Sequence, residues 1–336
     1  MNAPTATPAA AGPDSVLPFA VEGLDVRGRV VRLGPALDAI LGRHDYPAPV
    51  SRLLGEAIAL AALLGTSLKF DGRFILQTSG DGPVDLLVVD FTTPDAIRAY
   101  ARFDAERVAA ADPRANAATL LGTGHLAMTV DQGAHTSRYQ GVVALDGASL
   151  EEIAHRYFAQ SEQIPTRVRL AVGEMTRRGA DGTPEHGWHA GGILVQFLPA
   201  SEDRIRTRDI DPGDAPEGVS PAAGHGDEDD AWVEARALVE TVEDIELIDP
   251  EVTPERLLYR LFHERGARVF EPRPLFDRCR CSRERVTGML RGLTAEERAE
   301  VSLPDGSIEV TCEFCSTRYR YTAEDVAAVA TDTPPA

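Results

Sequence analysis

Four cysteines gathered in one short C-terminal window constrain this chain more than any other feature. All the cysteines of the 336-residue sequence fall in two close pairs, a C-x-C pair at Cys279 and Cys281 and a C-x-x-C pair at Cys312 and Cys315. Two such pairs on separate turns can supply the thiolate tetrahedron that zinc prefers, with Zn–S distances of roughly 2.3 Å. The spacing therefore predicts one four-cysteine zinc site. Four sulfur ligands leave no position open for substrate or water, so we expect a structural metal.

The expected compartment is the cytoplasm. The N-terminal stretch "MNAPTATPAAAGPDSV" lacks a basic start and a continuous apolar segment, which excludes a secretory signal. The most apolar run, 57–68, is shorter than the roughly 20 residues of a membrane span and predicts a buried core helix. In the cytosol, clustered cysteines are more often metal ligands or redox sensors than structural disulfides.

Two alternative functions stay open, and the charge of the chain bears on the first of them. The formal net charge of -19 disfavours binding to nucleic acid or to an anionic membrane. A zinc-ribbon nucleic-acid-binding protein stays an alternative, because the stretch 278–292 carries five arginines, although Glu284 partly offsets them. A thiol-disulfide oxidoreductase is the second alternative, because C-x-x-C also occurs in such enzymes, but the sequence around Glu313 lacks their βαβ setting.

The region before the acidic stretch predicts an α+β fold. Alternating apolar segments such as "GRFILQTSG", "PVDLLVVDF", "HLAMTV" and "GGILVQFLP" predict strands separated by turn signals. Helical patterns occur at 50–68 and 149–161, and Ser149 with Glu152 fits a capping box at the start of the second. We therefore expect a large N-terminal domain in which helices pack on a mainly antiparallel sheet.

Residues 201–250 contain 16 acidic residues and four arginines. The first part of this stretch, rich in proline and glycine, cannot bury enough apolar area to order itself and predicts a flexible loop. From Trp232 the apolar residues recur at helical spacing at Ala235, Leu238, Val242 and Ile245, which predicts a helix to about Ile248.

A second helix is expected from Thr253 as N-cap, with Pro254 at its first position and Gly266 as a stop. Its apolar stripe consists of Leu257, Leu258, Leu261 and Phe262. The two helices form a linker between the large domain and the cysteines. From the residues alone they are either ordinary core packing or a detachable cover over an apolar surface.

The segment "LLYRLFHERGARVFEPRPLFDRCRCSRERV", followed by "DGSIEVTCEFCSTRYRYTAEDV", resembles the zinc-binding end of the 33 kDa heat-shock protein family. The upstream segments "SLKFDGRFILQTSGDGPVDLLVVD", "YFAQSEQIPT" and "AGGILVQFLP" resemble parts of that family's large domain, so the resemblance covers about 17–326. It implies a redox-regulated holdase chaperone of the cytoplasm, not an enzyme.

The resemblance also implies how the site works. The reduced, inactive protein would hold one zinc per chain through all four cysteines. Oxidation would form the disulfides Cys279 with Cys281 and Cys312 with Cys315, expel the zinc, and loosen the zinc domain and linker. The active form would be a homodimer that binds unfolded or partly unfolded client proteins without ATP, and neither nucleic acid nor a membrane would be a partner.

We expect six regions along the chain: a disordered tail (1–16), the large α+β chaperone domain (17–199), an acidic flexible loop (200–230), a helical linker (231–270), the zinc-binding redox-switch domain (271–328) and a disordered tail (329–336). The zinc domain is short enough that its own core cannot stabilise it. Metal coordination would then supply much of its folding free energy, on the order of 10 kcal/mol or more.

Overall fold

The structure is a computed structural model that describes residues 12–112, 114–133, 138–178, 183–198 and 229–331. The acidic loop expected at 200–230 lies almost wholly outside the described residues, as do most of the N-terminal tail and the end of the C-terminal one. Strand β1 (Ser15–Val21) begins inside the stretch expected to be a tail, because Ser15 pairs with Arg32 of the next strand.

Two six-stranded sheets build the large domain. In sheet A the order is β10 (Arg268–Val269), β1, β2 (Val26–Leu33), β9 (Pro184–Phe197) and β8 (Thr166–Arg178), and β11 (Arg273–Pro274) also pairs with β1. In sheet B the order is β12 (Phe276–Asp277), β5 (Ala96–Phe103), β4 (Val84–Thr92), β3 (Arg73–Gly80), β6 (Thr123–Asp131) and β7 (Tyr139–Asp146). The pairings are antiparallel except β12 with β5, which is parallel, so the predicted α+β class with a mainly antiparallel sheet is confirmed.

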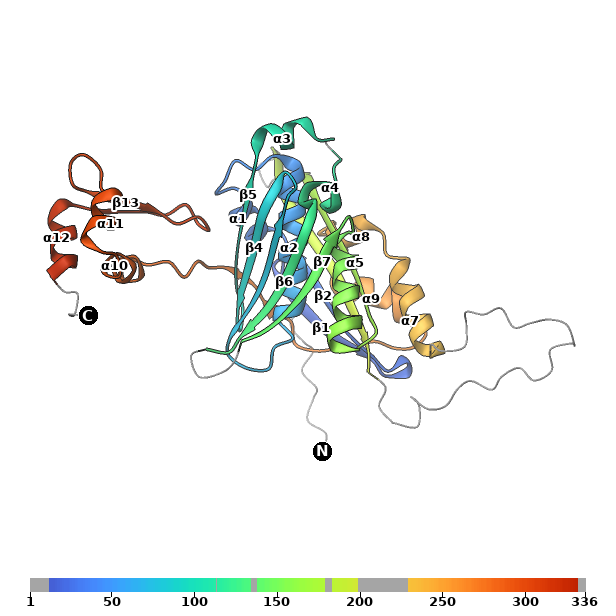
Figure 1. Cartoon of the computed structure of the whole chain (residues 1–336). Helices are drawn as coiled ribbons and strands as arrows, with labels where there is room; N and C mark the ends of the chain where they lie inside the picture. The colour runs from blue at the N-terminus through green and yellow to red at the C-terminus, as the bar shows by residue number, and fades with distance from the viewer. Residues whose placement is uncertain (1–11, 113, 134–137, 179–182, 199–228, 332–336) are drawn as a thin grey trace, which may run out of the picture.

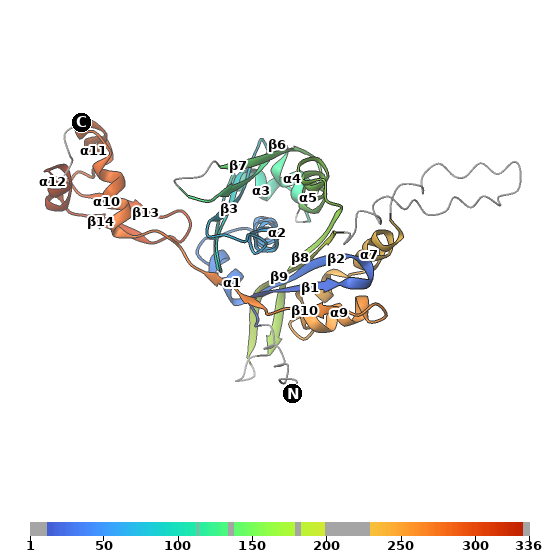
Figure 2. The same ribbon diagram turned by 90° about the horizontal axis from the view of Figure 1, so that it is seen from below.

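Helix α2 (Ala48–Gly65) lies between the two sheets, as Figure 2 shows end-on. Apolar residues occupy all sides of this helix, which is the pattern of a helix buried on every side. By length and composition it could cross a membrane, but 78% of that window is buried inside the fold. The predicted core helix is thus confirmed.

Shorter helices complete the large domain. They are η1 (Glu22–Leu24), α1 (Pro35–Leu41), α3 (Ala105–Ala110), α4 (Ala117–Leu121), α5 (Leu150–Tyr157) and the π-helical turn η2 (Phe158–Glu162). The predicted capping box of α5 is confirmed, because the Glu152 N–H donates to the Ser149 hydroxyl and the Ser149 N–H donates to the Glu152 carboxylate.

Sheet A is apolar on both faces. Along β2, Val31 and Leu33 face the core around α2, whereas Val26 and Val30 face the opposite side. Strand side chains alternate between faces, so an antiparallel sheet with apolar residues at both parities needs a second cover. Linker helices α7 (Asp230–Glu240), α8 (Asp244–Ile248) and α9 (Pro254–Phe262) provide that cover (Figure 2).

The linker differs from prediction in one respect. The single helix expected from Trp232 to Ile248 is broken at 241–243, because Glu243 forms a capping box with Glu246 and starts a new helix. Val242 is consequently buried, whereas Ile245 is 49% exposed and does not belong to the apolar stripe. The second helix is as predicted, since the Thr253 hydroxyl accepts from the Arg256 N–H and the predicted apolar stripe is buried.

The chain then runs along the edges of both sheets, through β10, β11 and β12, into the C-terminal module, defined here as residues 279–331 (Figure 1). The module contains α10 (Arg283–Arg291), α11 (Ala295–Glu300), β13 (Ile308–Thr311), β14 (Arg318–Tyr321) and α12 (Ala323–Thr331), so its last helix extends past the expected boundary at 328. Its core is small, with buried apolar side chains at Val286, Leu290, Ile308 and Tyr321. Such a core needs further stabilisation.

Candidate metal centre

The four cysteines lie on two segments that the fold brings together. Cys279 and Cys281 occupy the extended chain between β12 and α10, where Ser282 caps the helix. Cys312 and Cys315 occupy the turn that joins β13 to β14, closed by hydrogen bonds from the Cys312 N–H to the Thr317 carbonyl and from the Ser316 N–H to the Cys312 carbonyl. The cysteine pair itself therefore forms the hairpin connection.

The Asp305-Gly306 dipeptide, just before the second cysteine pair, predicts a hairpin turn from the sequence, and this prediction is wrong. Gly306 has φ +77° and donates its N–H to the Leu303 carbonyl, so these residues do form a turn. That turn leads into β13, however, and does not join two paired strands.

The four sulfur atoms form a cluster that fits a metal ion. They all lie within 4.8 Å of one another, with Sγ–Sγ distances of 3.7 Å for Cys279 and Cys312 and 3.2 Å for Cys281 and Cys315. A tetrahedron with Zn–S bonds of roughly 2.3 Å has edges of roughly 3.8 Å. The cluster is thus of the size that a tetrahedral thiolate site requires, and the structure brings together all four predicted ligands.

Polar groups around the cluster act on the sulfurs. The Tyr319 hydroxyl donates to Cys281 Sγ at 3.2 Å. Without metal, burial raises the pKa of the Cys312 thiol to about 12. At Cys315 burial also acts to raise the pKa, but hydrogen bonds with Thr317, Cys281 and Cys312 together outweigh it and the pKa falls to about 6. A bound metal would hold all four as thiolates.

The cluster lies against β5 of the large domain. Arg98 Nη1 donates to Cys279 Sγ at 3.6 Å, and the same guanidinium stacks on Phe314, which lies between Cys312 and Cys315 in sequence. The ring of Tyr100 also lies near that of Phe314, with the two ring centroids 6.4 Å apart.

A buried carboxylate strengthens this contact. Asp90 of β4 is 4% exposed and accepts hydrogen bonds from Arg98 (2.7 Å) and from Arg280 (2.6 Å), the residue between Cys279 and Cys281. Arg43 forms a bidentate ion pair with Asp277, which precedes Cys279 by two residues. Arg98, Asp90 and Arg43 were not identified from the sequence, because no local motif marks residues separated from the cysteines by about two hundred positions.

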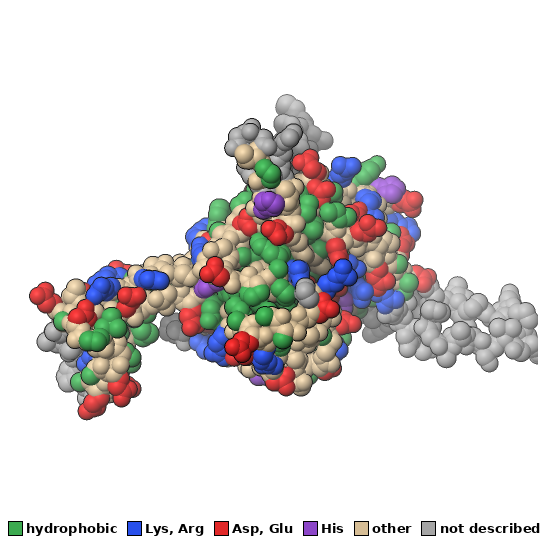
Figure 3. Space-filling view, turned by 90° about the horizontal axis from the view of Figure 1, so that it is seen from above, with side chains coloured by type: hydrophobic (Ala, Val, Ile, Leu, Met, Phe, Trp, Pro, Cys, Tyr) green, Lys and Arg blue, Asp and Glu red, His purple; other side chains and the backbone are tan. Residues whose placement is uncertain are grey.

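The predicted basic stretch is largely neutralised. Arg278, Arg280 and Arg283 pair respectively with acidic residues at 95, 90 and 325, at distances of 2.9, 2.6 and 3.1 Å. On the face drawn in Figure 3, acidic and basic side chains are interspersed. This arrangement disfavours the nucleic-acid alternative.

Comparison with known proteins agrees with this architecture. Residues 14–322 match the family described as "Hsp33 protein". A 33 kDa chaperonin of Caulobacter vibrioides is 49% identical over 91% of this chain and 94% of the relative, and one of Pseudomonas fluorescens is 39% identical over 92% and 91%. The crystal structure of the 33 kDa chaperonin of Thermotoga maritima shares the fold, with a TM-score of 0.70 at 23% identity over 95% of this chain and 98% of the other. The chain belongs to the Hsp33 family of redox-regulated holdase chaperones and is not an enzyme.

Proposed function

We propose that oxidation of the four cysteines releases the linker helices from sheet A and exposes a surface that holds unfolding proteins without ATP. The observation that carries this proposal is the second apolar face of sheet A. On that face the buried side chains include Leu17, Phe19, Val21, Val30, Ile193 and Val195, all of them covered by the linker helices. Exposed together, they would form an apolar patch of the kind that binds other polypeptides.

Zinc is the proposed metal, one ion per chain, held by Cys279, Cys281, Cys312 and Cys315 in the reduced protein. Sulfur-only ligation in a tetrahedral cluster favours zinc over oxygen-preferring ions such as magnesium and calcium. When bound, the ion would cross-link two segments of a module whose own core is small. Its loss would therefore unfold the module.

The proposed oxidation forms two disulfides, Cys279 with Cys281 and Cys312 with Cys315. In each pair, the two thiolate sulfurs give up two electrons to hydrogen peroxide, which takes up two protons and is reduced to two water molecules. Both bonds join sequence neighbours, so neither links the 279–281 segment to the hairpin turn. Local pairing leaves the module free to unfold, whereas the crossed pairs that lie 3.7 and 3.2 Å apart in the cluster would keep the two segments together.

Unfolding of the module would remove one end of the linker's support. The linker follows directly into the cysteine segment through β10, β11 and β12, and β12 is held by its pairing with β5 and by the ion pair of Asp277 with Arg43. We propose that these contacts of β12 and Asp277 are lost on oxidation and that helices α7 to α9 then leave sheet A. The released apolar face also supports the proposed homodimer of the oxidised form, and the reduced thiols fit a cytoplasmic protein.

The test compares reduced and oxidised protein directly. Light scattering of a chemically denatured client diluted into buffer should show aggregation with the reduced protein and suppression with the peroxide-treated protein. Elemental analysis should give one zinc per reduced chain and none after oxidation, and peptide mapping should find the two local disulfides. Equal suppression by both forms, or crossed disulfides in the active form, would refute the proposal.

A further inference from the structure

One buried guanidinium of sheet A binds the backbone at the end of helix α8. Arg32 of β2 is 8% exposed and lies on the linker face of the sheet, at the same strand parity as Val30. Its hydrogen bonds go to backbone carbonyl oxygens: Nη1 donates to Leu247 (2.6 Å) and Asp249 (3.1 Å), and Nη2 donates to Glu246 (2.5 Å) and Val252 (2.5 Å). Together these contacts hold the end of α8 and the chain that follows it.

A glycine on the neighbouring strand is the second part of this binding site, which we call the seat. A Cβ atom placed on Gly191 of β9 would lie 1.9 Å from the carbonyl oxygen of Leu247, a distance that no side chain could tolerate. The three nearest atoms to that Cβ all belong to Leu247, so the space is reserved for the linker backbone. Arg32 and Gly191 therefore form one site for the Leu247 carbonyl group. Gly191 lets this carbonyl approach the sheet closely, and the Arg32 guanidinium donates a hydrogen bond to it.

The hydrogen bonds of this seat recognise backbone rather than side chains. Arg32 donates to main-chain oxygens, and Gly191 admits a main-chain carbonyl, so any polypeptide sequence could supply the same groups. Apolar burial accompanies them, since the Leu247 side chain is fully buried in the linker-face cluster. The seat thus combines carbonyl recognition with an apolar surface.

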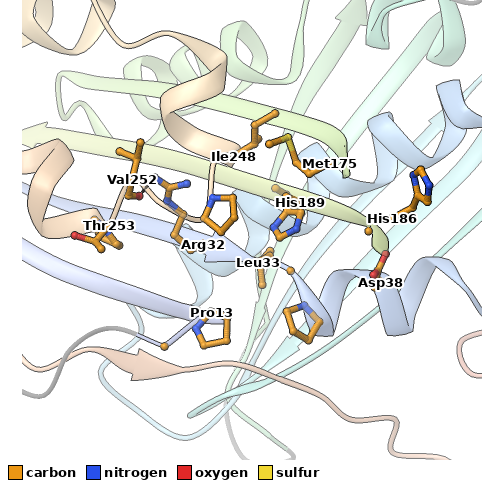
Figure 4. A pocket seen from close by; sticks show the side chains of 17 residues that line it. Pro13, Arg32, Leu33, Asp38, Met175, His186, His189, Ile248, Val252 and Thr253 are labelled. Carbon is orange, nitrogen blue, oxygen red and sulfur yellow. Dashed lines mark hydrogen bonds between the residues drawn. The ribbon is translucent and has the colours of Figure 1, made fainter. Parts of the chain in front are cut away.

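A cavity continues from the seat along the sheet. It has a volume of about 750 Å³, and Figure 4 shows Arg32 with Val252 and Thr253 at one end and Asp38 and His186 toward the other. There is room beside the α8 backbone for further polypeptide without displacement of the sheet. The site is consequently larger than its present occupant.

Release of the linker would uncover Arg32, and water would replace these four acceptors. When a client covers the apolar surface again, the guanidinium needs new protein acceptors, because a buried charge without hydrogen-bond partners is strongly disfavoured. An unfolding protein offers backbone carbonyls that have lost their partners, next to apolar side chains that have lost their core. The seat vacated by α8 fits that chemistry.

We propose that Arg32 and Gly191 form a carbonyl-binding seat that holds α8 in the reduced protein and binds the backbone of an unfolding client after the linker leaves. The proposal rests on the proposed function, because it requires that oxidation releases the linker. It gives a physical reason why one surface accepts clients of unrelated sequence. The linker and the client compete for the same donors.

The experiment uses full-length Arg32→Met and Gly191→Ala variants, with Arg27→Met as the matched control. Methionine retains the unbranched stem of Arg32 and removes its donors, and alanine at 191 blocks the close approach. Arg27 is an exposed arginine on the same strand. The probe is fluorescent, reduced and carboxymethylated α-lactalbumin, which stays unfolded, with a blocked peptide of residues 243–254 as competitor. Far-UV circular dichroism checks that each variant keeps its sheets.

With oxidised protein, we expect Arg32→Met and Gly191→Ala to bind the probe about tenfold or more weakly than Arg27→Met. Arg32→Met loses hydrogen bonds from a charged donor, each of which contributes about a factor of ten, and Gly191→Ala keeps the carbonyl group from approaching that donor. The peptide should displace the probe from the control. If both variants bind as tightly as Arg27→Met, the seat is only a latch for the linker and the proposal falls. If Arg32→Met does not fold, Gly191→Ala decides.

Failure of the proposed function would look different. In that case oxidised wild type and Arg27→Met would themselves not bind the probe, and the client seat would fall with it. In the reduced protein, Arg32→Met and Gly191→Ala should both speed hydrogen exchange at 244–254 relative to the control. Unchanged exchange in both variants would show that Arg32 and Gly191 do not hold α8, and would also overturn the proposal.

Discussion

The guanidinium of Arg98 lies over the ring of Phe314, with its Cζ atom 4.0 Å from the ring centroid, and so joins β5 to the residue between Cys312 and Cys315. The same guanidinium donates to Cys279 Sγ and to Asp90. Both halves of the cysteine cluster therefore touch one cation of the large domain. This contact makes the position of the C-terminal module depend on the integrity of the cluster.

Substitution of Arg98 should loosen the module without changing the thiols. In Arg98→Met, hydrogen exchange across 276–281 and 312–316 in the reduced protein should accelerate about tenfold, because a cation–π contact and charge-assisted hydrogen bonds are lost. Zinc content should be unchanged. Arg102→Met is the control, since Arg102 lies on the same strand but forms an exposed ion pair with Asp85. Equal exchange in both variants would show that Arg98 does not dock the module.

Glu56 predicts a pH dependence of stability. Burial, followed by repulsion from Glu151 and Asp244, raises the pKa of this α2 carboxyl to about 7. The folded state then binds a proton that the unfolded state has released, so the free energy of unfolding falls as pH rises from about 4.5 to 7. Glu56→Gln should therefore be more stable than wild type at pH 8, by up to about 3 kcal/mol, and lose this advantage by pH 4.

Urea unfolding of the reduced, metal-loaded proteins at the two pH values would measure this effect. Glu152→Gln is a useful comparison, because the hydrogen bond that its carboxylate accepts from the Ser149 backbone N–H lowers the pKa of Glu152. Its contribution has the opposite sign and is lost as pH falls through the folded pKa. A Glu56→Gln advantage of the same size at pH 4 and pH 8 would mean that protonation of Glu56 is not responsible.

Oxidation should act on the linker and leave the sheets intact. We expect hydrogen exchange in α7, α8 and α9 to approach that of an unfolded chain after peroxide treatment, while β2, β9 and α2 stay protected. The surface ion pair of Arg265 with Glu234 is too exposed to hold α7 and α9 in place by itself. Protection of the linker that survived oxidation would assign these helices to the permanent core.

Much of this architecture follows from local sequence signals. The capping box of α5, the apolar run of α2 and the close cysteine pairs each encode their structure within a few residues, and so these helices and the cluster could be predicted. The break between α7 and α8 was missed because Ile245 matches the helical spacing, while the competing N-cap at Glu243 is not one of the preferred capping residues.

The contacts between distant segments could not be predicted in the same way. Arg32 carries no motif, and its carbonyl partners lie more than two hundred positions away. Sequence also predicted two amphipathic linker helices without showing which surface they cover. That assignment depends on the two-sided apolar pattern of sheet A, which has meaning only once strands β1, β2 and β9 are known to be neighbours.

The central claim is that unfolding of the C-terminal module, rather than the disulfides as such, exposes the client surface. Its most direct test is light scattering of an aggregating client with the Cys312→Ser, Cys315→Ser double variant, kept in reductant. The variant lacks two of the four thiolates, so it should lose its metal and the stabilisation that the metal supplies. Glu313→Gln is the control, because it alters the same turn and retains all four thiols. We predict that the double variant suppresses aggregation in reductant, whereas wild type and Glu313→Gln do not; a soluble, metal-free double variant that still required peroxide would contradict the account.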